Sequence, residues 1–338
     1  MELSKGFIDP PANRPKPGHT PIGKRRGFLL LGFLMTLPAI LLGRSLADRL
    51  ETRRVAKADE ELLLTARMIA RNVGLQVDEY AKAAEMLAKQ VEAWGTLEPV
   101  QLQKIVTTEK AAFPGLALMY VGSADGISIA VEPPFDKFGT PNAGTNYRDR
   151  DYYQEVVRTG KTFISKARLG RVSHVPNIQI ASPIWDEKGH FIAFSQDAID
   201  LLNIFPARVE EILSGRPNIK AIVIDREGQT LAHPDRTAVE ELRDLSKHPL
   251  FKATTQATGE LRRGVDETGA AVHAAIVPVL KRDLNWQVIV YQSEASLKTE
   301  AVVVRRQVWM ITAAGLLTGL FFVVIAAWLN ASRRSTKT

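Results

Sequence analysis

A short segment in the middle of the chain carries residues suited to bind a small charged molecule. Arg150 could hold a carboxylate through two parallel hydrogen bonds, because its guanidinium group presents paired N–H donors. Tyr147, Tyr152 and Tyr153 lie beside it and could line a pocket with both ring surface and hydroxyl groups. Asp197 follows a predicted strand and could pair with an ammonium group. These residue types predict a binding site for a carboxylate or amino-acid-like metabolite.

Each of these assignments has a simpler alternative. Arg150 stands in the run Arg-Asp-Arg-Asp at 148–151, and such runs commonly form solvated ion pairs. Tyr152 and Tyr153 are adjacent, so on a helix they face different ways and at most one is central to a pocket. Asp197 could instead cap the turn that follows its strand.

Three further cations, Lys166, Arg168 and Arg171, favour a small carboxylate or another anion as the ligand, and Arg168 joins the predicted binding residues. Signals for catalysis are missing from the sequence. It has no cysteine, which excludes disulfides, thiolate nucleophiles and cysteine-ligated zinc, and its six histidines lack a metal-binding spacing. An exported enzyme is also an alternative, but no nucleophile elbow, phosphate-binding loop or paired-carboxylate motif supports it. We expect neither an enzyme nor a cofactor.

Two apolar segments predict that the chain crosses a membrane twice. Residues 27–43 and 308–329 are 17 and 22 residues without a charge, and a spanning helix needs about 20. We place the spans at 27–43 and 307–329. The first segment could instead be a cleavable signal peptide, because basic residues precede it and Ser45-Leu46-Ala47 follows it. In both cases residues 44–306 are exported.

The positive charge of the chain lies in its two tails. Residues 1–26 carry six Lys/Arg and two acids, and residues 331–338 carry three Lys/Arg, which accounts for the net charge of +7. This distribution predicts that both tails are cytoplasmic, with the domain between them outside a bacterial inner membrane, in the periplasm or at the cell surface. It gives no indication of a nucleic-acid partner. Residues 1–26 are rich in proline and charge and are expected to be disordered, and residues 330–338 form a second short tail.

The exported region begins with a helical pattern and then changes to strands. Residues 45–94 have apolar positions at helical spacing and predict a long helix, interrupted only by Gly74. From residue 115, short apolar runs are separated by acid-and-glycine turns, which is typical of antiparallel hairpins. The predicted strands are 116–121, 127–131, 178–185, 191–196, 219–224, 230–233, 260–265, 271–278 and 286–291.

The strand pattern occurs twice. Two strands, a helical insertion and further strands span residues 116–196 and again 219–291, with insertions at 149–158 and roughly 238–256. We therefore predict an α+β fold, in which a long N-terminal helix precedes two tandem antiparallel-sheet modules and two transmembrane helices flank them. The membrane-distal module covers about 95–205 and the proximal module about 215–292. Residues 293–306 are predicted to be helical and to run into the second span.

The residues themselves resemble a known family of sensors. Residues 147–165 (YRDRDYYQEVVRTGKTFIS) and 178–201 (IQIASPIWDEKGHFIAFSQDAIDL) resemble the membrane-distal module of double Cache domains, found in chemoreceptors, sensor kinases and cyclases. Residues 221–235 (AIVIDREGQTLAHPD) resemble the proximal module. The resemblance covers about 46–300. It implies PAS-like modules and a ligand pocket between the distal sheet and the insertion at 150–158.

The amino-acid-binding branch of this family has a motif that the chain matches only in part. Arg150 and Asp197 match it, but Tyr152 replaces a tryptophan and Thr145 replaces the first tyrosine. The region 168–170 also lacks the Tyr-any-Asp pair. The resemblance therefore does not favour an amino-acid ligand.

These observations predict a membrane-anchored ligand sensor, expected to form a homodimer. Gly315 and Gly319 form a GxxxG motif in the second span, where two helices could approach closely or the spacing could be chance. The sensor would pass its signal to a separate cytoplasmic output protein, or the sequence is the front part of a longer receptor. The alternative is an anchored binding or scaffold protein that serves a transporter or envelope complex without signalling.

Overall fold

The structure is a computed structural model that describes residues 22–251 and 259–335. Residues Arg53–Ala301 form one compact unit, here called the sensory unit, and residues 1–52 and 302–338 form another. Most of the predicted disordered tail, up to residue 21, lies outside the described residues. Residues 22–26, which were assigned to that tail, belong to a helix.

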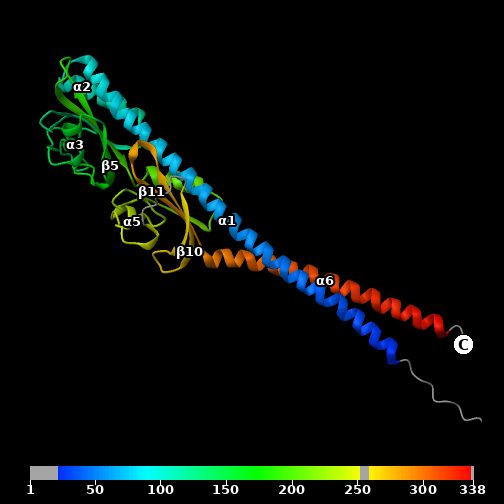
Figure 1. Cartoon of the computed structure of the whole chain (residues 1–338). Helices are drawn as coiled ribbons and strands as arrows, with labels where there is room; N and C mark the ends of the chain where they lie inside the picture. The colour runs from blue at the N-terminus through cyan, green and yellow to red at the C-terminus, as the bar shows by residue number, and fades with distance from the viewer. Residues whose placement is uncertain (1–21, 252–258, 336–338) are drawn as a thin grey trace, which may run out of the picture. The chain divides into compact units, whose positions relative to one another are not determined.

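Helix α1 (Ile22–Trp94) is 73 residues long and continues through Pro38 and Gly74. In the sensory unit, one of its faces is apolar and fully buried, with Leu62, Ile69 and Leu87 each 0% exposed. These residues belong to a core that also contains residues from both sheets. Figure 1 shows this part of α1 lying along the two sheets. The spacing of its apolar residues thus makes the helix the shared support of both modules.

The distal module contains a six-stranded antiparallel sheet in the order β2-β1-β6-β5-β3, with β4 also paired to β5. Helix α2 (Pro99–Ala112) packs on β1 and β2, and helix α3 (Asp151–Thr159) packs on β5. The strands are β1 (Leu116–Ser123), β2 (Ser128–Glu132), β3 (Phe163–Ile164), β4 (Arg168–Leu169), β5 (Pro176–Trp185) and β6 (Phe191–Asp200).

The proximal module contains a five-stranded antiparallel sheet in the order β8-β7-β11-β10-β9. Its strands are β7 (Ile219–Ile224), β8 (Thr230–Ala232), β9 (Glu260–Val265), β10 (Ala271–Val279) and β11 (Trp286–Ser293). In both sheets the last strand of the module inserts beside the first, so the modules share one topology. A long helix with two antiparallel sheets confirms the α+β prediction, and helix α4 (Ile204–Leu213) follows the distal sheet.

The helical insertion predicted at about 238–256 is mostly wrong. The structure has only helix α5 (Arg236–Glu240) and the short 3-10 turn η1 (Pro249–Phe251), and residues 252–258 lie outside its described part. Leu242 has φ +50°, and Pro249 cannot donate a helical hydrogen bond. Leu242 therefore ends helical structure after α5, and Pro249 can only begin a helical turn, as it does in η1.

Each sheet has two covered faces. The face toward α1, here called the spine face, carries aliphatic residues such as Ile178 and Val288. The opposite face, here called the outer face, differs between the modules: it is rich in tyrosine in the distal module and mainly aliphatic in the proximal module. The two outer faces therefore share a topology but differ in the side chains that they carry.

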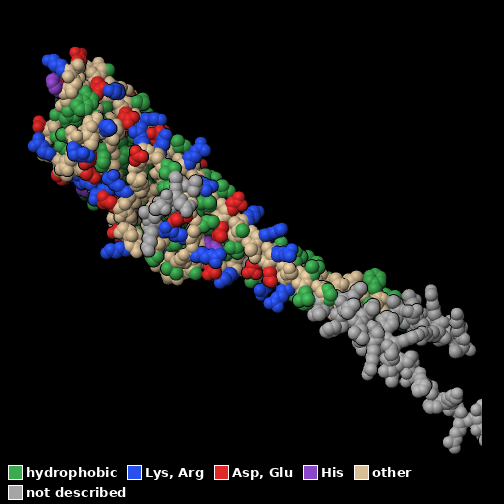
Figure 2. All heavy atoms as spheres, in the orientation of Figure 1, with side chains coloured by type: hydrophobic (Ala, Val, Ile, Leu, Met, Phe, Trp, Pro, Cys, Tyr) green, Lys and Arg blue, Asp and Glu red, His purple; other side chains and the backbone are tan. Residues whose placement is uncertain are grey.

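Helix α6 (Glu294–Ser335) begins directly after β11 and is 42 residues long. Its segment Arg305–Ile325 has a mean hydropathy of 2.3 and is 6% buried. Among the described residues, it is the single stretch long and apolar enough to cross a membrane. The first predicted span, residues 27–43, lies within α1 and stays a prediction. On the visible face of the sensory unit, by contrast, basic and acidic side chains are interspersed (Figure 2).

Candidate functional site

A small, half-enclosed cavity lies on the outer face of the distal sheet. Its volume is about 10 Å³, which is enough for about one water molecule. Strands β1, β5 and β6, the start of α3 and the loop that follows β4 all contribute to its wall. The lining residues are Leu118, Tyr120, Tyr147, Arg150, Tyr152, Gly170, Arg171, Val172, Ser173, Asn177, Gln179, Gln196 and Ala198.

Strand alternation brings the polar side chains of the sheet to this cavity. Neighbouring residues of a strand point to opposite faces, so Gln196 and Ala198 of β6 share the outer face. Asn177 and Gln179 of β5 do the same. Tyr120 lies opposite Gln196 in the pairing of β1 with β6. Three adjacent strands thus place a polar patch in the middle of an apolar face.

Three tyrosines form one wall of the cavity. The rings of Tyr120 and Tyr147 stack with their centroids 4.9 Å apart, and the hydroxyl groups of Tyr120 and Tyr152 are 3.0 Å apart. Burial raises the pKa of Tyr147 to about 12, so its hydroxyl keeps its proton at neutral pH. The Tyr147 hydroxyl forms no hydrogen bond of good geometry with another described residue, although the Thr145 side chain is close enough to lower its pKa. It is therefore available to donate to a ligand.

The charge run around Arg150 separates into paired and unpaired members. Three neighbouring arginines each have a carboxylate partner, whereas no carboxylate among the described residues lies within ion-pair distance of Arg150. The ion pairs are Arg148–Asp125 (3.0 Å), Arg168–Asp151 (2.6 Å) and Arg171–Asp149 (2.6 Å). Arg150 caps the start of α3 and lines the cavity. The structure thus leaves its guanidinium group free for an anion.

Gln196 is the second unsatisfied group in the cavity wall. Its side chain is 1% exposed, and both its amide oxygen and its amide nitrogen are without a partner among the described residues. A buried amide that makes no hydrogen bond costs free energy, so such groups commonly mark a site for a ligand or water. Gln196 can both donate to a ligand and accept from it.

The amides of β5 are, in contrast, already ordered. Gln179 donates to the side-chain oxygen of Asn177, and Asn177 donates to the hydroxyl oxygen of Ser173 over 3.0 Å. This chain of hydrogen bonds fixes the orientation of the polar floor before a ligand arrives.

Three of the six predicted site residues meet at the cavity, namely Tyr147, Arg150 and Tyr152. Tyr153 faces elsewhere: its hydroxyl donates to the Ala124 carbonyl oxygen over 2.7 Å, and its ring packs edge-on against Phe194. Arg168 pairs with Asp151 and is not part of the cavity wall.

Asp197 lies on the spine face, opposite the cavity. Its neighbour on that face, Ser195, donates to the Ala84 carbonyl oxygen of α1 over 2.7 Å. Asp197 is 0% exposed, both its oxygens lack a partner among the described residues, and burial raises its pKa well above the ordinary value. Because β6 continues to Asp200 instead of ending near residue 196, alternation points Asp197 away from Gln196.

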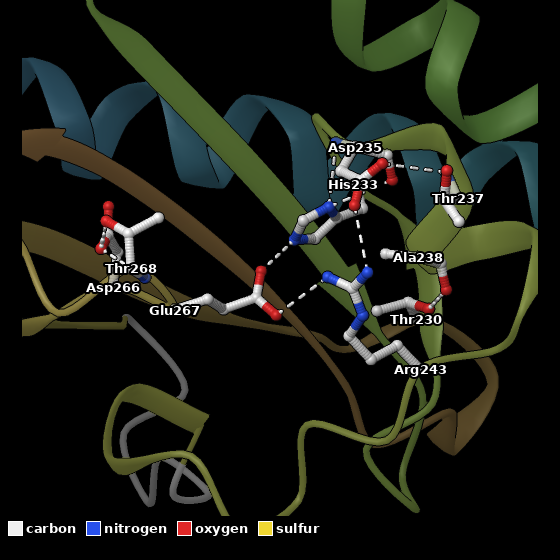
Figure 3. Close-up of polar contacts among 9 residues, drawn as sticks. All are labelled: Thr230, His233, Asp235, Thr237, Ala238, Arg243, Asp266, Glu267 and Thr268. Atoms are coloured by element: carbon white, nitrogen blue, oxygen red, sulfur yellow. Dashed lines mark hydrogen bonds and ion pairs between the residues drawn. The ribbon is translucent and has the colours of Figure 1, made fainter.

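The proximal module shows what the same topology looks like with an apolar filling. Its outer face packs aliphatic strand residues such as Ile222 and Ile289 against Leu250 and Phe251. The charges of its loops are paired with one another (Figure 3). The contacts are His233–Glu267 (2.6 Å), Arg243–Glu267 (3.3 Å) and Arg243–Asp235 (3.1 Å). The proximal module also has an unpaired polar group, the Gln287 side-chain oxygen. The distal module is set apart by a tyrosine-walled cavity that gathers Arg150, Tyr147 and Gln196.

Comparison with known proteins assigns the chain to a family. Residues 52–301 match a family model described as Cache domain, in its dCache_1 form. None of the curated proteins matches the chain significantly.

Several solved structures share the fold at low sequence identity. The ligand-binding domain of the Pseudomonas fluorescens chemoreceptor CtaA, in complex with L-isoleucine, is 16% identical with a TM-score of 0.57, over 74% of this chain and 98% of that chain. The periplasmic sensory domain of the Campylobacter jejuni chemoreceptor Tlp1 is 13% identical with a TM-score of 0.58, over 72% and 98%. An extracellular ligand-binding receptor from Desulfohalobium retbaense is 13% identical with a TM-score of 0.56, over 69% of this chain but only 40% of that chain.

Proposed function

We propose that this chain, which belongs to the double Cache family, is a membrane-anchored sensor that binds a small carboxylate in its distal module. One observation carries this proposal: the unpaired guanidinium of Arg150 lines the same cavity as the unpartnered polar groups of Tyr147 and Gln196. An anion held by Arg150 could accept from the tyrosine hydroxyl and exchange hydrogen bonds with the glutamine amide.

The lining also bears on the ligand class. Among the described residues that line the cavity none is acidic, and Asp197 faces the spine. An ammonium group placed there would lose its hydration without gaining a counter-charge. This favours hydroxy- or oxo-carboxylates over α-amino acids, although the related domain of CtaA was solved with L-isoleucine.

Signalling requires that the bound state reach the membrane. We expect a two-pass protein of the bacterial inner membrane, with spans at 27–43 and 307–329 and with the sensory unit outside. We also expect a homodimer and a separate cytoplasmic output protein. Gly315 and Gly319 face open space, since a Cβ added at either would meet no atom within 4 Å, so this face of α6 is open to the approach of a second helix.

The test is thermal unfolding of the full chain in detergent with matched acid pairs. Lactate is compared with alanine and malate with aspartate, because each pair differs mainly in a hydroxyl or an ammonium group. A ligand at 100 times its dissociation constant stabilises a protein by about 2.7 kcal/mol. We expect a shift with at least one hydroxy acid and a smaller shift with its amino partner. Absence of any shift across carboxylates and amino acids would favour an anchored scaffold protein instead.

A further inference from the structure

The loop that joins β3 to β4 is hydrogen-bonded to the cavity wall. Ser165, which is 2% exposed, has two acceptors for its hydroxyl proton, the Gln179 side-chain oxygen and the Lys166 carbonyl oxygen, each at 2.8 Å. The same hydroxyl accepts from the Gln179 backbone N–H over 3.0 Å, and the Ser165 N–H donates to the Gln179 carbonyl oxygen over 2.8 Å. Because Gln179 lines the cavity, a displacement of its side chain acts directly on this loop.

The next two residues of the loop contact the proximal module. The backbone N–H of Ala167 donates to Oδ2 of Asp225 over 3.1 Å, and the Lys166 ammonium lies 2.8 Å from the Glu227 carboxylate. Asp225 is 2% exposed, whereas Lys166 and Glu227 are more open to solvent. The buried Asp225 contact is therefore the one protected from competition with water.

Both carboxylate oxygens of Asp225 accept hydrogen bonds, but only one of them is needed for its own turn. Asp186, Asp225 and Asp266 each open an Asp-x-x-Gly turn, and in each the Oδ1 oxygen accepts from two backbone N–H groups. For Asp225 the donors are Glu227 and Gln229, over 2.8 and 3.0 Å. The corresponding bonds of Asp186 and Asp266 lie within their own hairpins. The second oxygen of Asp225 is thus committed to the other module.

Only strands β7 and β11 separate Asp225 from helix α6. Strand β7 ends at the preceding residue, Ile224, which pairs with Gln287 of β11. Strand β11 continues directly into α6 at Glu294. Beside the loop, Ser165 and Arg226 line a cavity of about 250 Å³ between the modules. The modules are therefore not close-packed beside this loop.

We propose that the loop 165–167 and Asp225 form a relay that couples occupancy of the distal cavity to β7 and β11. This inference rests on the proposed function, because it takes the distal cavity as the ligand site. A ligand larger than the cavity must displace its lining, which includes Gln179. Ser165 transmits that displacement, and the Ala167–Asp225 hydrogen bond passes it to the proximal sheet. Asp225 is a positioning residue in this scheme and touches no ligand.

A side chain can stand in for the ligand, which makes the test independent of ligand identity. Ala198→Leu adds bulk inside the cavity, and amide hydrogen exchange of the full chain in nanodiscs reports on β11. We expect exchange in 286–293 to change by about fivefold or more, the lower end of couplings between sites. In the double variant Ala198→Leu/Asp225→Asn this change disappears. The asparagine can keep the Oδ1 bonds of the turn but offers an amide where Oδ2 accepted.

Asp266→Asn is the matched control, because it alters the same kind of turn without a bond to the other module. It should leave the response to Ala198→Leu intact. The relay is refuted if Ala198→Leu changes exchange in 191–200 but not in 286–293, or if the response survives Asp225→Asn. Either result would contradict the relay without contradicting the proposal that the distal cavity binds a ligand. Ala198→Val adds less bulk and replaces Ala198→Leu if the larger residue prevents folding.

Discussion

The carboxylates around Arg150 are already paired with three other arginines, so its guanidinium group has no ion-pair partner among the described residues. Replacing Arg150 with alanine removes a charged hydrogen-bonding group from the cavity, and hydrogen bonds to charged groups contribute about 1.5 to 3 kcal/mol. We therefore expect Arg150→Ala to weaken carboxylate binding by about 10- to 100-fold, measured by calorimetry on the full chain. Arg148→Ala removes an arginine that is paired with Asp125 outside the cavity, so unchanged binding in this control separates a local role from general loss of positive charge. Equal losses in both variants would contradict the prediction.

A substitution at Gln196 should reverse the expected preference of the cavity for hydroxy acids over amino acids. Gln196→Glu keeps the shape of the side chain but places an acid in a cavity where none of the described lining residues is acidic. An ammonium group then has a counter-charge, so the preference should move toward the amino acid of each matched pair. Thermal unfolding with lactate and alanine checks this. Asp197→Asn changes an acid on the opposite face and should leave the preference as it was.

Asp197 gives the fold an unusual dependence on pH. Burial raises its pKa well above the ordinary value of 3.8, so the folded chain binds this proton more tightly than the unfolded chain. The favourable contribution is complete below about pH 4 and is lost as pH rises through the folded-state pKa. Asp197→Leu removes a buried group without a described partner and should stabilise the protein by about 1 to 3 kcal/mol at neutral pH. The gain should shrink toward pH 4, and a constant gain would show that ionisation is not its cause.

At the scale of elements, the turn η2 (Lys281–Asp283) fastens the proximal module to α1. Arg282, at φ +52°, donates to Asp78 over 2.6 Å and to Glu85 over 2.7 Å. The bond from Arg282 lowers the pKa of Asp78 from 3.8 to about 2. The contact therefore stabilises the fold above about pH 4 and loses that effect as pH falls through 2.

Arg282→Ala should accordingly cost about 1 kcal/mol near neutral pH, because one pKa unit corresponds to about 1.4 kcal/mol, Lys82 and Lys281 account for part of the shift, and solvent screens the pair. Denaturant unfolding at a series of pH values should show the wild-type and variant curves converging below pH 4. Lys281→Ala is the comparison and should cost less, because Lys281 is half-exposed and its ammonium lies 3.5 Å from the same Asp78 carboxylate. A cost that does not depend on pH would assign the effect of Arg282→Ala to packing alone.

The elements predicted most accurately are the strands that are bounded by residues typical of tight turns. Hairpins such as the one closed by Asp266 and Gly269 were located closely, because an acid that accepts backbone bonds and a glycine at positive φ leave a clear signature. Helix α2 and the two-residue strands β3 and β4 were not predicted. The pairing of such short strands depends on β5, which is distant in sequence, and not on a local pattern.

The structure places three of the six predicted site residues at the cavity and the other three elsewhere, and the binding role of all six stays a prediction. Arg150 and its tyrosines were recognisable because their residue types are suited to binding. Gln196 was missed and Asp197 was chosen in its place, because a shift of one residue along a strand moves a side chain to the other face. The strand had to be known to extend to Asp200 before its alternation could be assigned.

At the scale of the whole molecule, the exposed side of α1 offers a surface for the proposed dimer. Leu64, Leu75 and Met86 are each about half-exposed and recur every 11 residues, or three helical turns, and Met68 lies on the same stripe. Leu75→Glu should shift the full chain toward monomers in mass photometry. Val157→Glu changes a similarly exposed residue on α3 and should not. A chain that stays dimeric with Leu75→Glu has its interface elsewhere.

The small volume of the distal cavity has a consequence for response time. A cavity of about 10 Å³ cannot admit a metabolite until its walls part, so the rate of opening sets an upper limit on the rate of capture. Association should then level off as ligand concentration rises, at the rate of a loop motion on the microsecond-to-millisecond scale.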